Sequence, residues 1–129
     1  MTIPAKAVSI DEAMDPNEVL DWGISMAPVL EDGEAIDDSD WSIVLGVEGV
    51  AVGHEIIEGD PDWPDPALVN DDDGNTTIIR FWTRTDPAFL GNPAFQGEGV
   101  SVPIEATIWT TSTPRRKRQR TVLIKVVEQ

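Results

Sequence analysis

The sequence has no cysteine, no tyrosine and a single histidine, His54. Without cysteine the chain forms no disulfide and offers neither a thiolate nucleophile nor a cysteine-ligated metal site. One imidazole is too few for a histidine-rich metal site, and a Ser-His-Asp arrangement cannot be argued from one histidine in an expected strand. We therefore interpret His54 as an ordinary strand residue.

Other signatures of chemistry are also missing. No glycine-rich phosphate loop opens a helix, because the Gly97-Glu98-Gly99 segment is short and leads into an expected strand. Residues 71–75 lack the spacing of a calcium-binding EF-hand, so a nonspecific surface calcium site and a solvated turn stay open as interpretations. We expect no enzymatic activity, no catalytic residue and no required metal or cofactor.

No apolar run approaches the roughly 20 residues that span a bilayer. The start of the sequence lacks the basic and apolar stretches of a signal peptide, so we expect the protein to fold in a cytoplasm. A length of 129 residues fits one domain, and an apolar content of 40% is too high for a wholly disordered chain. These features predict a globular protein with one core.

Basic residues are scarce, with 9 Lys and Arg against 24 Asp and Glu, and the net charge is -15. Such a surface repels nucleic acid and anionic membranes, so we expect neither as a partner. Five of the nine basic residues form one basic cluster, Arg115, Arg116, Lys117, Arg118 and Arg120. We predict that this cluster projects and docks on an acidic surface of another protein or a neighbouring copy. An exposed charged loop without a partner is the alternative.

Alternating apolar residues predict strands along most of the chain. The clearest example begins at Val19, where Leu20, Trp22, Ile24 and Met26 share one face. Further strands are expected at 41–45, 50–57, 76–84, 100–108 and 121–127, and the last two form a hairpin around a loop at 111–119. No convincing amphipathic helix is present. The pattern predicts an all-β protein, an antiparallel immunoglobulin-like β-sandwich.

We expect one sandwich domain over residues 19–129, with loop expansions at 58–75 and 86–99. Residues 1–18 offer Ile3, Val8, Ile10 and Met14 but too little apolar area to hold themselves, so we interpret them as an N-terminal arm that packs only on a partner. A short helix at 10–14 is compatible with that interpretation.

Five tryptophans divide into two groups by position. Those in expected strands, Trp22, Trp41, Trp82 and Trp109, are assigned to the core or the space between sheets. Trp63 lies in a proline-rich acidic loop. It is a candidate partner-binding anchor or a stacking platform for a sugar, or it only pins its loop to the sandwich.

Three stretches resemble the small fiber-tail adaptor proteins of tailed bacteriophages. They are Asp15-Pro16-Asn17-Glu18-Val19-Leu20-Asp21-Trp22, Ile36-Asp37-Asp38-Ser39-Asp40-Trp41, and Trp109-Thr110-Thr111 followed after a turn by Arg120-Thr121-Val122-Leu123-Ile124-Lys125-Val126. The closing turn departs from the family pattern, because it has Pro114 and an almost purely basic composition instead of glycine and mixed charges.

The resemblance implies an Ig-like structural virion protein, assembled in the host cytoplasm, that connects head and tail or carries fibers. Its implied partners are other virion structural proteins, the connector, tail or fiber proteins, in a symmetric assembly of several copies. A second hypothesis is a carbohydrate- or host-surface-binding β-sandwich module with Trp63 and the expanded loops at its tip. An acidic mimic of DNA is a third, motivated only by charge.

Overall fold

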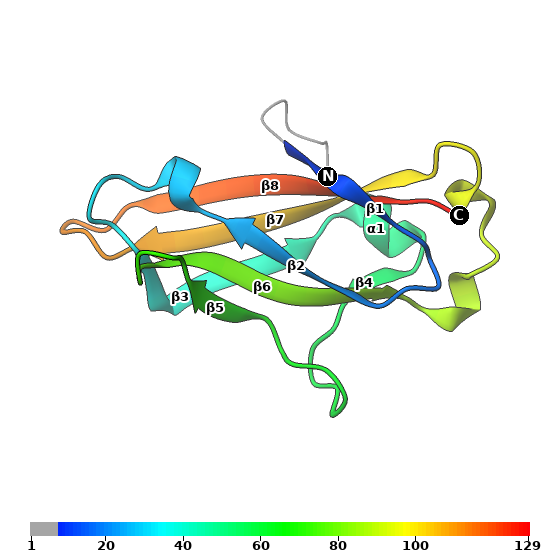
Figure 1. Cartoon of the computed structure of the whole chain (residues 1–129), viewed down its shortest axis with the longest axis horizontal. Helices are drawn as coiled ribbons and strands as arrows, with labels where there is room; N and C mark the ends of the chain where they lie inside the picture. Colours follow the sequence, from blue (N-terminus) through cyan, green and yellow to red (C-terminus); the bar gives the residue numbers. More distant parts are fainter. Residues whose placement is uncertain (1–7) are drawn as a thin grey trace.

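A computed structural model describes residues 8–129 of the chain as a sandwich of two β-sheets (Figure 1). This confirms the all-β prediction. In chain order the strands are β1 (Val8–Met14), β2 (Leu20–Ser25), β3 (Ile36–Leu45), β4 (His54–Ile56), β5 (Ala67–Asn70), β6 (Thr76–Thr85), β7 (Val100–Thr110) and β8 (Lys117–Val126). The helical segments are short: η1 (Ala27–Val29), α1 (Val47–Ala51), η2 (Pro87–Phe89) and η3 (Pro93–Phe95).

The first sheet has the strand order β1-β8-β7-β3, and the second has the order β2-β6-β4. Strand β5 pairs with the same strand, β6, as β4 does. Every pair is antiparallel except β1 with β8, which run parallel. Within the described residues, β3 and β4 are therefore end strands, one in each sheet.

The core follows from the alternation of buried side chains along the central strands. On β7 every second side chain from Val102 to Thr110 is buried, and Ile79 and Phe81 of β6 are fully buried in the opposite sheet. Strand β2 adds Trp22 and Ile24, as the sequence predicts. Because side chains of a strand alternate between faces, this pattern fixes which face of each strand packs inward.

The predicted hairpin is the longest feature of the fold. Strands β7 and β8 pair from Val100 with Val126 to Trp109 with Lys117. The connection is shorter than the predicted loop at 111–119, because β8 begins at Lys117. Most of the basic cluster therefore lies on a strand and not in a projecting loop.

The N-terminal boundary differs from the prediction. Residues 8–14 are not an arm or a helix but strand β1, which pairs with β8. Met14 is fully buried, and its carbonyl accepts a hydrogen bond of 2.9 Å from the amide of Val127. The pairing with β8 supplies the contacts that this short segment cannot supply alone. The first part of the predicted arm, residues 1–7, lies outside the described residues.

Two further segments differ from the expected strands and loops. The run expected as a strand at 50–57 is divided between the end of α1 and the short strand β4. The expected loop at 58–75 contains β5, and the remaining part between β4 and β5 extends away from the body of the sandwich (Figure 1). No helix within residues 8–129 is long and apolar enough to cross a membrane.

The tryptophans are less buried than predicted. Trp22 is a core residue with 6% of its surface exposed, and its indole Nε1 donates a hydrogen bond of 2.9 Å to the hydroxyl of Thr83. Trp41, Trp82 and Trp109 are only half-buried. Trp82 alternates with the buried Phe81 and Thr83, and Trp109 alternates with the buried Ile108 and Thr110, so both lie on the outer faces of their sheets.

Candidate functional site

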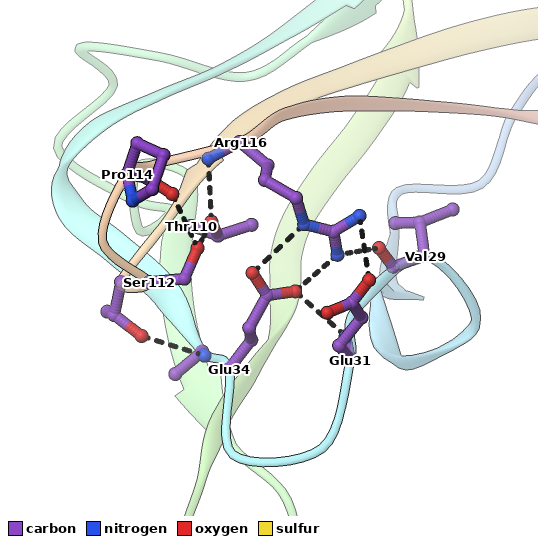
Figure 2. A network of polar contacts seen from close by, with 9 residues as sticks. Val29, Glu31, Glu34, Thr110, Ser112, Pro114 and Arg116 are labelled. Carbon is purple, nitrogen blue, oxygen red and sulfur yellow. Dashed lines mark hydrogen bonds and ion pairs between the residues drawn. The ribbon is translucent and has the colours of Figure 1, made fainter.

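The predicted docking residue Arg116 is held within the molecule. Its guanidinium Nη2 donates to Glu34 Oε1, and its Nε donates to Glu34 Oε2 at 3.1 Å, so the pair is bidentate (Figure 2). A second carboxylate, that of Glu31, lies 3.5 Å from Arg116 Nη1. The side chain of Glu34 is only 5% exposed. Bidentate pairing fixes orientation as well as adding energy, so this contact holds the hairpin end against the loop between η1 and β3.

Hydrogen bonds between Ala35 and Thr111 also join the same two segments. The amide of Thr111 donates to the carbonyl of Ala35 at 3.0 Å, and the amide of Ala35 donates to the hydroxyl of Thr111 at 3.1 Å. Across the hairpin end, the amide of Thr110 donates to the carbonyl of Arg116 at 2.9 Å, and the amide of Arg116 donates to the hydroxyl of Thr110 at 2.9 Å. The hydroxyl of Ser112 lies 2.8 Å from the hydroxyl of Thr110 (Figure 2). The turn between β7 and β8 is therefore bonded at several points to the loop between η1 and β3.

Arg115 continues this contact on the outer face of the sheet. Its Nη1 lies 2.9 Å from Asp37 and 3.5 Å from Asp40, and its guanidinium stacks over the ring of Trp109 at 4.9 Å. Lys117 approaches the same ring at 6.0 Å. Cation–π contacts of this kind add to the ion pairs at partly exposed sites.

These contacts lower the pKa values of the acidic partners. Hydrogen bonds from Arg116, and then from the amide of Glu31, hold the pKa of Glu34 well below its usual range. The hydroxyl and amide of Ser39, and then Arg115, lower the pKa of Asp37. Both carboxylates are therefore charged at neutral pH and match the cations that they contact.

The prediction that the basic cluster projects from the molecule is therefore wrong. Arg115 and Arg116 are paired with acids of the same chain, and Arg120 donates to the backbone carbonyl of Ser25. The segment at 31–40 carries six Asp and Glu residues, but other segments of the chain, such as 58–75, are also strongly acidic. What the sequence does not give is the pairing of β3 with β7, which brings the segment at 31–40 beside the hairpin end.

Trp63, the other predicted docking residue, lies at a different place, on the loop between β4 and β5. The guanidinium of Arg84 lies 5.5 Å from the centre of its ring. Arg84 is itself bound by Glu55 at 2.7 Å and Asp60 at 3.0 Å, which raise its pKa. Trp63 lines a cleft of about 510 Å³ together with Glu18, Glu55 and Leu90. The structure does not bring Trp63 and the basic cluster into one site.

A groove that sequence reasoning missed runs between the two end strands. One hollow, of about 420 Å³, lies along residues 41–43 of β3 and is closed by the loop between β4 and β5. A second, of about 580 Å³, continues along residues 43–45 and is closed by β4, α1 and η2. The hollows share Ile43 and Glu58, so they form one continuous groove, which we call the β3–β4 groove. No sequence signal marks it, because it depends on how two sheets align.

His54 lies at the wall of this groove, but only 3% of its surface is exposed. Its Nδ1 is 3.1 Å from the hydroxyl of Thr85, and Nε2 has no partner among the described residues. Burial lowers the pKa of His54 to about 4, so the ring is neutral at pH 7. No group of three or more His, Cys, Asp or Glu residues in the described part of the chain is arranged to hold a metal ion.

Comparison of the chain with protein-family models, curated proteins and solved structures found no match.

Proposed function

We propose that this protein is a structural virion protein of a tailed bacteriophage, an adaptor or connector at the head-tail junction or tail that docks neighbouring virion proteins or fibers. The observation that carries the proposal is the sequence resemblance to fiber-tail adaptors in three separated stretches. They correspond to the turn leading into β2, the start of β3, and the hairpin of β7 and β8. The proposal includes the immunoglobulin-like type of sandwich that the resemblance implies.

The physical character of the chain supports this role. The β7–β8 hairpin is tied to the neighbouring loop by the bidentate Arg116–Glu34 pair and by two hydrogen bonds between Thr111 and Ala35. A connector has to transmit force between partners without losing its shape. A small sandwich with a packed core and a hairpin end bonded to the neighbouring loop suits that task. Several copies would each bring a net charge of -15, so larger partners are needed to hold them together.

The experiment is to delete the gene from the phage genome and to supply the protein from a plasmid as the complementing control. We expect the deletion to yield heads and tails that are unjoined, or tails without fibers, in electron micrographs, and we expect the plasmid to restore complete particles. Complete and infectious particles from the deletion alone would show the proposal to be wrong.

A carbohydrate- or host-surface-binding module is the second candidate, and the cleft at Trp63 is the observation that favours it. An aromatic ring beside carboxylates such as Glu18 and Glu55 is a suitable lining for a sugar, because the ring stacks and the carboxylates accept hydroxyl hydrogen bonds. A glycan array with the intact protein and with Trp63→Ala tests it. Binding that Trp63→Ala removes supports this candidate, and the absence of any bound glycan removes it.

A further inference from the structure

The exposed apolar side chains of the described residues gather at one place. The large hydrophobic residues with substantial exposure are Val44 at 52%, Val47 at 58%, Val50 at 61% and Phe89 at 38%. Val44, Val50 and Phe89 all line the β3–β4 groove, and Val47 lies one helical turn before Val50 on α1. An apolar group concentrated in a groove of an otherwise acidic protein marks an interaction site.

Phe89 is placed there by a specific device. Gly53 has a φ of +77°, and a Cβ at that position would lie 2.3 Å from the ring of Phe89. Only glycine therefore allows the ring to lie against the backbone at this point. The ring forms part of the groove wall while 38% of its surface remains exposed.

The groove runs along an unprotected sheet edge. Within residues 8–129, β3 pairs only with β7, so alternate residues direct backbone N–H and C=O groups toward the groove side. The first half of β3 carries Asp37, Asp38 and Asp40 and a register shift, which are devices that protect an edge from pairing. The second half, residues 41–45, has no charged residue and keeps regular pairing.

The charge of the groove selects the kind of partner. Its lining includes Glu55, Glu58, Asp65 and Asp86, and no Lys or Arg is among the lining residues. Two copies meeting through this edge would bring the same acidic groups together, which disfavours a homodimer. A segment with positive charge is favoured instead.

We propose that the β3–β4 groove receives an extended segment of a partner protein, which adds as a strand to residues 41–45 of β3 and carries alternating apolar side chains with a lysine or arginine. Main-chain hydrogen bonds supply affinity in this mode, and side-chain hollows supply specificity. Five residues of strand extend over about 17 Å. The inference depends on the groove alone and not on the proposed virion role.

The test uses a capped synthetic peptide of about seven residues in which valine alternates with lysine and threonine. Binding to the full chain is measured by titration calorimetry and by NMR shifts of backbone amides. We expect binding that perturbs residues 41–45 and 54–56 and weakens with salt. A peptide with glutamate in place of lysine should bind at least about tenfold more weakly, since its charge has the sign of the groove.

Two variants localise the binding. Val44→Lys places a cation in the groove at a half-exposed position, and we expect it to weaken binding of the basic peptide by about tenfold or more. Ala67→Lys makes the same charge change at an exposed position of β5 and should leave binding unchanged. A basic peptide methylated on alternate backbone nitrogens, which cannot pair along one edge, should not bind.

Three results would overturn the proposal. One is no binding of the basic peptide at millimolar concentration. Another is equal binding of the methylated peptide, which would exclude strand addition. The third is a dimer of the chain in sedimentation that Val44→Lys abolishes while the peptide fails to bind, because the groove would then be an interface between copies.

Discussion

Trp22 and His54 both carry polar ring nitrogens into buried positions, with different consequences. The indole N–H of Trp22 is satisfied by Thr83, whose own hydroxyl points to the sulfur of Met14 at 3.5 Å. The imidazole of His54 has one nitrogen paired with Thr85 and one without a partner in the described residues. Trp22 therefore links β2 to β6 without leaving its indole N–H unpaired. His54 is stable in its buried position only in the neutral form.

The buried His54 predicts a pH dependence of stability. The pKa of His54 is about 4 in the folded protein against an ordinary value of 6.5, so the unfolded chain binds more protons between these values. Stability is therefore full above about pH 6.5 and falls as the pH falls toward 4, by about 3 kcal/mol at pH 4. Urea unfolding of the protein and of His54→Gln across this range checks it. An identical pH profile for the two would contradict it.

The partial burial of Trp41 predicts unequal costs of truncation. Trp22→Ala removes a core side chain and should cost about 3–5 kcal/mol in the free energy of unfolding. Trp41→Ala removes a half-buried ring and should cost clearly less. Urea denaturation of both variants is the measurement. Equal losses would mean that Trp41 is as buried as the sequence pattern predicts.

Among the elements, the β7–β8 hairpin depends on the Arg116–Glu34 contact at its end. We expect Glu34→Gln to raise hydrogen exchange at residues 110–116 more than Asp40→Asn does, because Asp40 lies 3.5 Å from its arginine and is half-exposed. Since the pKa of Glu34 is lowered from 4.5, its stabilisation is present above that pH and is lost as the pH falls below it. Glu34→Gln should therefore remove part of the acid sensitivity. A larger effect of Asp40→Asn would contradict this assignment.

The sequence predicted the strands that show a local pattern of apolar residues. It did not predict the strands that form only because they pair with a distant part of the chain. Alternation placed β2, β6 and the hairpin, because each strand shows one apolar face by itself. Strand β1 was predicted as an arm because its stability comes from β8, more than a hundred residues later in the chain. Strand β5, of four residues in an acidic proline-rich segment, has too little local pattern to stand out.

The candidate site was predicted only in its composition. The basic cluster and Trp63 are correctly singled out as unusual residues, but their partners Glu34, Asp37 and Arg84 come from other elements. The β3–β4 groove lies outside sequence prediction altogether. It arises because β3 and β4 end different sheets and their side chains meet only after the sheets have packed.

For the molecule as a whole, charge is the dominant feature. A net charge of -15 destabilises the compact state through self-repulsion, and added salt screens that repulsion over about 10 Å at 0.1 M. We expect the melting temperature to rise by about 4 °C, equal to about 1 kcal/mol for a domain of this size, between low and moderate sodium chloride. The double variant with Asp72→Asn and Asp73→Asn, in an exposed turn, should show a smaller rise in melting temperature over the same range of salt. A melting temperature that falls as salt is added would mean that internal ion pairs outweigh the repulsion.

The proposed virion role is tested most directly by the composition of purified particles. Particles from an infected host culture are separated on a density gradient, washed, and analysed by quantitative mass spectrometry for peptides of this chain. We expect the protein to be present in a fixed ratio to the other structural proteins and to stay in the particles through washing. Its complete absence from intact particles, while it is abundant in the soluble part of the same lysate, would show that it is not a virion protein.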